Sequence, residues 1–227
     1  MSRPSTRRGP ALLAASLCLS LLSVLPAAAH ELVRAPVAGQ AAQAGPGAGP
    51  RSADARLVMS WVARTGDNRG MPFVIVDKAD TKVFVFDGQG RLLGATDALL
   101  GLARGDDSAP GIGDRKLSDI PPEQRTTPAG RFVASLGRGL PDKDLLWVDY
   151  DTSLAIHRVL AANTAEHRLQ RLASASPLSH RITFGCINVP ARFYDDVVRP
   201  AFTGTSGIVY ILPETRTVAE VFFKSNS

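Results

Sequence analysis

Residues 183–190 contain a cysteine, Cys186, that directly follows a glycine, Gly185. A thiol on a sharp turn beside a glycine can act as a nucleophile, with neighbouring backbone N–H groups to hold an oxyanion. A free cysteine is also among the most often buried residue types, where it packs as a small apolar side chain. Both interpretations of Cys186 stay open until the other residues that could share its chemistry are considered.

A cysteine nucleophile needs a base to take its proton, and histidine is the usual one. His157 ends a predicted strand at residues 154–157, which places its ring at a strand terminus. His167 falls on the charged face of a predicted helix, and His180 falls in the loop just before Cys186. We favour His157 as the partner of Cys186, although a structural role is open for each of the three histidines.

Residues 1–29 have the three parts of a secretory signal peptide. Three arginines precede an apolar core at residues 11–25, and the small residues of a cleavage site follow at 26–29. The apolar run is short for a membrane span. We therefore predict export to the periplasm, with no stable membrane span after signal cleavage; an uncleaved anchor is the alternative.

Export changes what the composition implies. The chain has 26 basic and 21 acidic residues, but without the three arginines of the signal peptide its net charge is only +2. No dense basic patch with interleaved aromatic residues is left, so we predict no nucleic-acid partner. One cysteine and four histidines also show no metal-ligand spacing, and we predict neither a metal site nor a cofactor.

Signal cleavage removes Cys18 and leaves Cys186 without an intramolecular disulfide partner. The remaining thiol is then buried and inert, paired with another chain, or reactive. An unpaired thiol is a liability in an oxidising compartment, which makes a functional role easier to justify.

Residues 30–54, rich in Ala, Gly, Pro and Gln, predict a flexible linker, and residues 55–227 predict one domain with a core at 72–213. The expected strands span residues 73–77, 82–87, 91–96, 131–136, 145–150, 154–157 and 207–212. The expected helices span residues 55–63, 163–173 and 190–198. A long loop at 101–124 has the length typical of an active-site lid. These patterns predict a mostly β domain, a β-sandwich or partly open barrel with a few short helices.

Three elements of this domain, in this order, resemble the motifs of one enzyme family. The first is the Thr-Pro-Ala-Gly-Arg-Phe run at residues 127–132, the second is Ile156-His157, and the third is Thr-Phe-Gly-Cys-Ile-Asn at 183–188. Together they resemble the YkuD-type L,D-transpeptidase catalytic domain. The resemblance covers roughly residues 72–213 and implies the mostly β fold of that family.

The chain departs from the family pattern at three places. Phe184 stands where the family has a histidine before Gly-Cys. The spacer from His157 to Cys186 is 29 residues, longer than usual, and the extra length is largely the predicted helix at 163–173 and the loop after it. Arg158 stands where serine or glycine usually follows the first histidine.

The resemblance implies a role for each residue near the thiol. Cys186 would be the nucleophile and His157 the general base and acid, while the N–H groups around Gly185 would hold the oxyanion. The Arg158 carbonyl would orient the imidazole, and its side chain could meet a substrate carboxylate. Further substrate contacts are expected from His180, Thr183, Phe184 and Asn188, of which Asn188 could instead tie down the loop.

The substrate that the resemblance implies is a peptidoglycan stem peptide. Cys186 would form a thioester with the third residue of a tetrapeptide and release the terminal D-alanine, and an amine or water would resolve the thioester. A hydrolase of the same fold, such as an L,D-carboxypeptidase or an enzyme that cuts a protein–peptidoglycan bond, is one alternative. A non-catalytic cell-wall binding domain with a buried thiol is another. The acceptor and the oligomeric state are not determined by the sequence.

Overall fold

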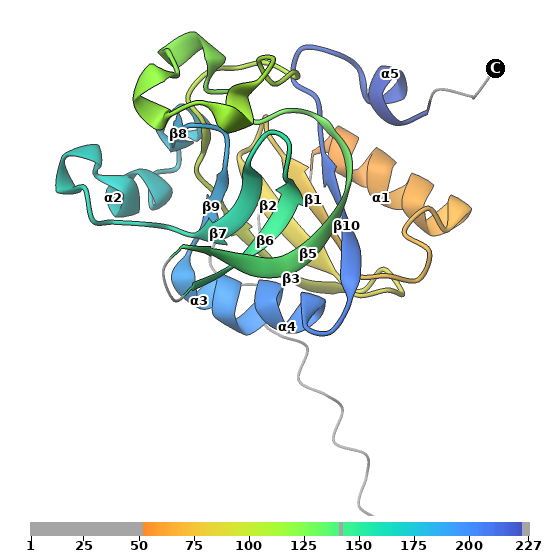
Figure 1. The fold of residues 1–227 in the computed structure, drawn as a ribbon. Helices are drawn as coiled ribbons and strands as arrows, with labels where there is room; N and C mark the ends of the chain where they lie inside the picture. The colour runs from red at the N-terminus through yellow and green to blue at the C-terminus, as the bar shows by residue number, and fades with distance from the viewer. Residues whose placement is uncertain (1–51, 141–142, 224–227) are drawn as a thin grey trace, which may run out of the picture. The chain divides into compact units, whose positions relative to one another are not determined.

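The computed structural model describes residues 52–140 and 143–223 (Figure 1). The predicted signal peptide and nearly all of the predicted linker lie outside the described residues. The described part is built mostly of β-strands with a few short helices, as the sequence predicts. Within it, no helix is both long enough and apolar enough to cross a membrane.

Eight strands form one strongly curved sheet in the order β3-β2-β1-β10-β5-β6-β7-β9. Neighbouring strands are antiparallel except for β1 with β10 and β7 with β9, which are parallel. The strands are β1 (Phe73–Asp77), β2 (Lys82–Phe86), β3 (Leu92–Asp97), β5 (Gly130–Leu140), β6 (Lys143–Asp149), β7 (Leu154–Arg158), β9 (Ile187–Val189) and β10 (Ser206–Ile211). A separate parallel pair, β4 (Leu100–Gly101) and β8 (Arg181–Thr183), lies at one end of the sheet.

The central strands are apolar throughout because both faces of the sheet are covered. On β1, Val74 and Val76 enter one core, while Phe73 and Ile75 enter a second core on the opposite face. This division follows from the two-residue period of a strand. The helix α1 (Ala53–Thr65) covers the second core with its buried Ala, Val and Val side chains.

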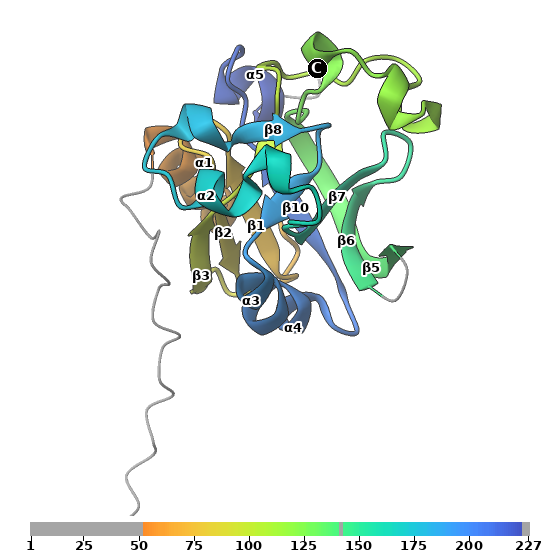
Figure 2. The same ribbon diagram turned by 90° about the vertical axis from the view of Figure 1, so that its left-hand side faces the viewer.

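A longer helical segment than expected covers the first core. It runs through α3 (Ala191–Phe193), the π-helical turn η6 (Tyr194–Val198) and α4 (Arg199–Phe202), past the predicted end at residue 198. The Arg199 N–H bonds to Tyr194 O, five residues back, and this wider turn lies just before Pro200, which has no N–H of its own. Figure 2 shows α3 and α4 at one end of the sheet and β8 with α2 at the other.

Two helical predictions need correction. The single helix expected at 163–173 is wrong, because His167 has a left-handed backbone (φ 50) that separates η4 (Thr164–Glu166) from α2 (Arg168–Leu172). A further 3₁₀ turn, η5 (Pro177–His180), leads into β8. The sequence interpretation also missed α5 (Val218–Phe222), which begins with a capping box made by Thr217 and Glu220.

Candidate active site

Parallel pairing of β7 with β9 brings the two halves of the predicted site together. In this register His157 is the partner of Asn188, and Ile156 is the partner of Ile187. Cys186 immediately precedes β9, so the two-residue period places it on the same face as Asn188. Diagonal neighbours on one face of a sheet lie within reach of long side chains. Residues 157, 186 and 188 therefore share one face at the edge of the sheet.

The turn before β9 is shaped by contacts to the chain around Thr127. Gly185 has φ +137, and a side-chain carbon there would lie 2.9 Å from Thr126 O. The Thr127 hydroxyl donates to Gly185 O (2.7 Å) and accepts from the N–H of Gly101 (2.9 Å). Only glycine fits this backbone conformation and this close approach.

Thr183, which we expected to contact substrate, serves the turn itself. Its hydroxyl accepts from the Gly185 N–H (3.2 Å) and donates to Cys186 O (2.7 Å). The N–H of Gly185 is thereby occupied. The N–H of Cys186, in contrast, makes no hydrogen bond to any residue that the structure describes, which leaves it as the donor available to an oxyanion.

A chain of hydrogen bonds fixes the orientation of His157. Arg168 Nη1 donates to Asn188 Oδ1 (2.7 Å), so the amide nitrogen of Asn188 faces His157 Nε2 at 3.1 Å. An arginine can only donate, so the amide donates in turn and Nε2 of His157 accepts. The other ring nitrogen, Nδ1, then carries the proton and donates to the carbonyl of Arg158 (2.8 Å). The carbonyl of Arg158 thus lies where an orienting group is expected.

Burial keeps both members of the proposed catalytic pair neutral. Burial lowers the pKa of His157, and the nearby positive charge of Arg168 lowers it further. The hydrogen bond to the Arg158 carbonyl raises this pKa but does not outweigh burial. Burial also raises the pKa of Cys186, which the N–H of Ala155 and the charge of Arg168 offset only in part. The thiol itself donates to Ser153 O at 3.4 Å. The resting site therefore holds a thiol and an imidazole rather than an ion pair.

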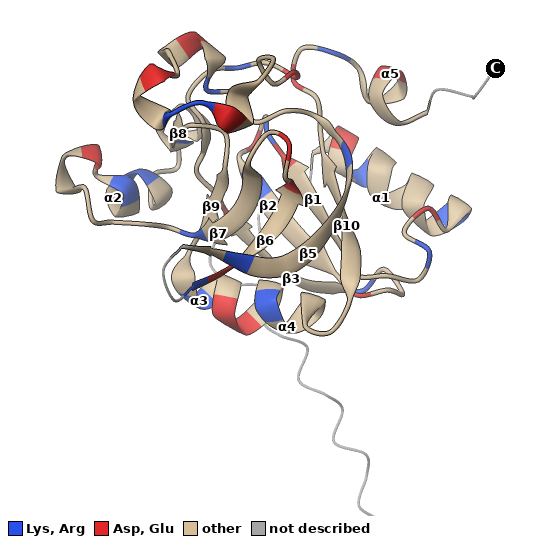
Figure 3. Cartoon of the chain, in the orientation of Figure 1, with Lys and Arg blue, Asp and Glu red and all other residues tan. Residues whose placement is uncertain are grey.

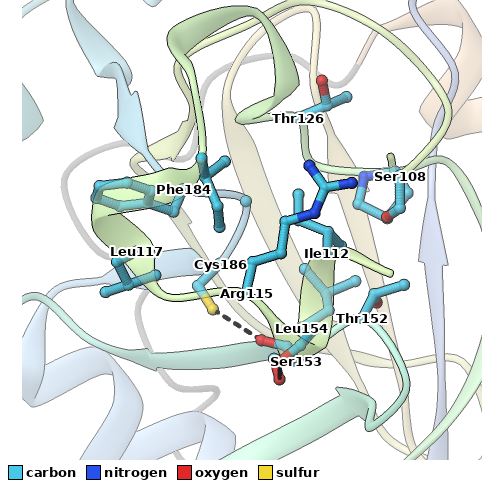
Figure 4. A pocket seen from close by; sticks show the side chains of 14 residues that line it. Ser108, Ile112, Arg115, Leu117, Thr126, Thr152, Ser153, Leu154, Phe184 and Cys186 are labelled. Atoms are coloured by element: carbon cyan, nitrogen blue, oxygen red, sulfur yellow. Dashed lines mark hydrogen bonds between the residues drawn. The ribbon is translucent and has the colours of Figure 1, made fainter. Parts of the chain in front are cut away.

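A pocket of about 170 Å³ opens beside Cys186 (Figure 4). Part of its wall comes from the loop predicted at 101–124, which folds into the 3₁₀ turns η1 (Ile112–Asp114), η2 (Leu117–Asp119) and η3 (Pro122–Gln124). The rest comes from Thr126 and Pro128, from residues 152–154 at the start of β7, and from residues 184–186. The long loop and the lone thiol, singled out separately from the sequence, thus line the same pocket.

Phe184 forms an apolar part of the pocket wall. Its ring lies under the guanidinium of Arg125, whose Cζ is 4.2 Å from the ring centroid. Arg125 is held by a bond from Nε to Ile120 O (3.0 Å). A cation over an aromatic face is attracted by the ring quadrupole, so this contact fastens residue 184 to the loop.

The Arg158 side chain does not face a substrate position. Its guanidinium bonds to Asp195 Oδ1 (2.5 Å) and Asp144 Oδ1 (3.0 Å) and lies over the ring of Tyr194 at 4.2 Å. The side chain is 12% exposed. Two protein carboxylates thus occupy the cation that we expected to meet a substrate carboxylate, and that expectation is corrected.

His180 is buried and both its ring nitrogens are engaged within the protein. Nδ1 contacts Thr81 Oγ1 (2.6 Å) and Nε2 contacts Ser174 O (3.0 Å). These contacts join the segment before β8 to the turn between β1 and β2. His167 is exposed at the break before α2. The histidine whose contacts join it to the Cys186 segment is His157.

The sequence interpretation missed Arg168. It lies in the extra length between His157 and Cys186, and its neighbours suggested a solvated helix face. Its guanidinium instead turns inward, bonded to Asn188 and to the carboxylate of Glu166. The unusual length of the spacer was the available signal that this segment contributes something to the site. Among the described residues, no group of three or more His, Cys, Asp or Glu side chains could hold a metal ion.

No family model matches the sequence, and no curated protein matches it. Similar solved structures include the LD transpeptidase LdtMt1 in complex with imipenem (15% identity, TM-score 0.35, covering 62% of this chain and 58% of that chain). Another is an L,D-transpeptidase from Xylanimonas cellulosilytica DSM 15894 (14% identity, TM-score 0.37, 62% and 60%). A third is a fused Zn-dependent amidase/peptidase/peptidoglycan-binding domain-containing protein from Clostridium acetobutylicum ATCC 824 (17% identity, TM-score 0.32, 68% and 62%). The chain spans about three fifths of the length of these structures, and a functional assignment has to rest on the site itself.

Proposed function

We propose that this protein is an exported cysteine acyltransferase that acts on peptidoglycan stem peptides. The observation that carries the proposal is the arrangement at the start of β9. A lone thiol lines a pocket, the N–H of the same residue has no partner among the described residues, and a histidine with a fixed tautomer lies on the adjacent strand. The substrate class comes from the resemblance of residues 127–132, 156–157 and 183–188 to the L,D-transpeptidase motifs.

The first half of the reaction forms a thioester. The thiol of Cys186 turns from Ser153 O toward Nε2 of His157, which exchanges the Asn188 amide for the thiol proton. The sulfur then attacks the carbonyl carbon between the third residue and the terminal D-alanine. The N–H of Cys186 holds the oxyanion, a contribution of about 3 kcal/mol for one donor. His157 returns the proton to the departing amine, and D-alanine leaves.

The second half regenerates the thiol. An acceptor amine attacks the thioester carbonyl and gives its proton to Nε2 of His157, which passes it to the departing sulfur. Because the Arg158 carbonyl holds Nδ1 throughout, Nε2 serves both halves of the reaction. Water in place of the amine gives the hydrolase that we kept as the alternative.

Intact-protein mass spectrometry tests the proposal. The purified protein is incubated with a stem tetrapeptide, and we expect an adduct of the tripeptide mass on Cys186 together with release of D-alanine. The Cys186→Ala variant should form no adduct and release no D-alanine, whereas the parent protein should do both. Unchanged D-alanine release by Cys186→Ala would refute the proposal. Addition of an acceptor amine distinguishes transfer from hydrolysis by the mass of the product.

A further inference from the structure

The pocket beside Cys186 contains a cation, Arg115, that caps the end of η1. Figure 4 shows its side chain extending across the pocket that Cys186 lines. Nη1 donates to Gln124 Oε1 (2.6 Å) and Nη2 donates to Pro110 O (2.7 Å). Both acceptors are neutral, so these bonds hold the guanidinium in place without neutralising its charge.

Arg115 and Arg125 differ from the other arginines around the site, because neither has a carboxylate partner among the described residues; the guanidinium of Arg125 lies over the Phe184 ring. Arg158 and Arg168 each bond to a carboxylate of the protein, and so does Arg181 beneath the loop. Arg115 has no ion pair with any residue that the structure describes. A guanidinium has five N–H donors, and only two of those of Arg115 are used. The remaining donors are available to an anion in the pocket.

The pocket is suited to a small anionic group. Ile112, Leu117, Ile120 and Leu154 line it beside Arg115, and apolar walls strengthen an attraction between opposite charges. Its volume is about 170 Å³. In the view of Figure 3, Lys and Arg segments alternate with Asp and Glu segments along the chain, and Arg115 is the charged residue among those that line the pocket.

We infer that this pocket is a subsite for the free carboxylate at the C-terminus of the substrate, with the Arg115 guanidinium as the group that binds it. This inference rests on the proposed function, because the carboxylate belongs to the residue that leaves when Cys186 attacks. The subsite restricts the reaction to the last peptide bond of a chain. A small terminal residue fits the volume, and the guanidinium matches a carboxylate with two parallel bonds.

Peptide binding to the otherwise intact Cys186→Ala protein tests the subsite without turnover. We expect a stem tetrapeptide with a free C-terminal carboxylate to bind at least tenfold more tightly than its C-terminal carboxamide. In Cys186→Ala/Arg115→Gln the two peptides should bind equally, and Arg115→Lys should restore part of the preference. Lys116→Gln removes a neighbouring exposed cation that does not line the pocket, and the preference should persist.

Three outcomes overturn the inference. One is equal binding of acid and amide by the protein with Arg115 intact, and another is a preference that survives Arg115→Gln. The third outcome is observed with a tetrapeptide that is amidated only on the side-chain carboxylate of its third residue. If Arg115→Gln removes a preference for that side-chain carboxylate over its amide, the C-terminal assignment is wrong. The adduct experiment separates this inference from the proposed function. An adduct that forms without any dependence on Arg115 refutes the subsite alone, and an Arg115-dependent preference without an adduct refutes the acyl transfer alone.

Discussion

Two hydrogen-bonded networks meet at the turn formed by Gly185 and Cys186, and they differ in charge. The first, here named the charged cluster, consists of Lys78, Asp106, Arg181 and Glu214. Lys78 donates to Asp106 (2.8 Å) and to two backbone carbonyls, and Arg181 pairs with Glu214 (2.5 Å). The second is the chain from Arg168 through Asn188 to His157, whose last two side chains are neutral.

The difference indicates what each network does. In the charged cluster all three protons of Lys78 have acceptors, and its side chain is 0% exposed. The Cys186 thiol makes one long hydrogen bond, and the backbone N–H of Cys186 makes none to the described residues. Thr127 links the charged cluster to the turn, since its carbonyl accepts from Lys78 and its hydroxyl donates to Gly185 O, and Asn188 links the second network to it by donating to Cys186 O (3.5 Å). A fully bonded cluster thus holds a turn on which reactive groups are left available.

The largest effect should come from breaking the charged cluster. Lys78→Met leaves two buried carboxylates with one cation fewer, and we expect a loss of about 3–5 kcal/mol in the free energy of unfolding. Urea unfolding measures the change. The matched control is Lys82→Met on the next strand, where the pair with Asp97 is partly exposed and a loss of about 1 kcal/mol or less is expected. Equal losses in the two variants would mean that the cluster does not stabilise the fold more than a surface pair.

The second effect concerns the turn where the networks meet. Gly185→Ala forces a side chain into a backbone conformation at φ +137 and against Thr126 O at 2.9 Å, with an expected loss of about 1–3 kcal/mol in unfolding free energy. We also expect adduct formation on Cys186 to fall by more than tenfold, because the N–H of Cys186 moves with the turn. Gly204→Ala is the control, since Gly204 also has positive φ (+74) but open space around it. It should lose stability without losing adduct formation; a parallel loss in both variants would contradict the role of the turn.

Local patterns explain how much of the fold the sequence could predict. Two short runs of β-branched and aromatic residues predict the hairpin of β1 and β2, and the spacing of Val58 and Val62 predicts the helix α1. The capping box at Thr217 was also readable, although the apolar run behind it is very short. The break at His167 was not readable, because a left-handed residue within a charged segment has no signature of its own.

The site divides in the same way. Cys186, Gly185 and His157 stand out by residue type and by position at strand ends. Lys78 falls between two predicted strands, and nothing local shows that it is buried, because its partners at residues 106, 127 and 214 come from distant parts of the chain. Arg168 is 20 residues from Asn188, and only the folded chain shows that its side chain turns inward. Long-range partners of charged residues are therefore what the sequence leaves undetermined here.

The neutral network should give the protein a sensitivity to acid. Only neutral His157 can take the thiol proton, and burial lowers the pKa of His157. As the pH is lowered, the rate of adduct formation should therefore stay constant past the ordinary imidazole pKa of about 6.5. Below the lowered pKa the rate should fall about tenfold per pH unit. The free energy of unfolding should also decrease at acidic pH. Burial lowers the pKa of both His157 and His180, so the unfolded chain binds protons first, and the free energy of unfolding should decrease as the pH falls from about 6.5 toward the folded pKa values. His157→Gln should remove part of that decrease, whereas exposed His167→Gln should leave it unchanged.

The smallest expected effect comes from Arg168, the charged member of the network that runs through Asn188 to His157. The thiolate of Cys186 should form only above about pH 9, because burial raises its pKa, and the charge of Arg168 opposes that rise. Arg168→Gln should therefore move the thiolate absorbance to still higher pH and slow alkylation by iodoacetamide at pH 8. Arg171→Gln on the same helix is the control, since Arg171 bonds to the carbonyls of Glu166 and Ser179. If both variants shift the titration equally, the effect belongs to the helix as a whole. A shift confined to Arg168→Gln means that one inward arginine of the spacer supplies a positive charge near the thiol. The uncharged ring of Phe184 cannot supply such a charge.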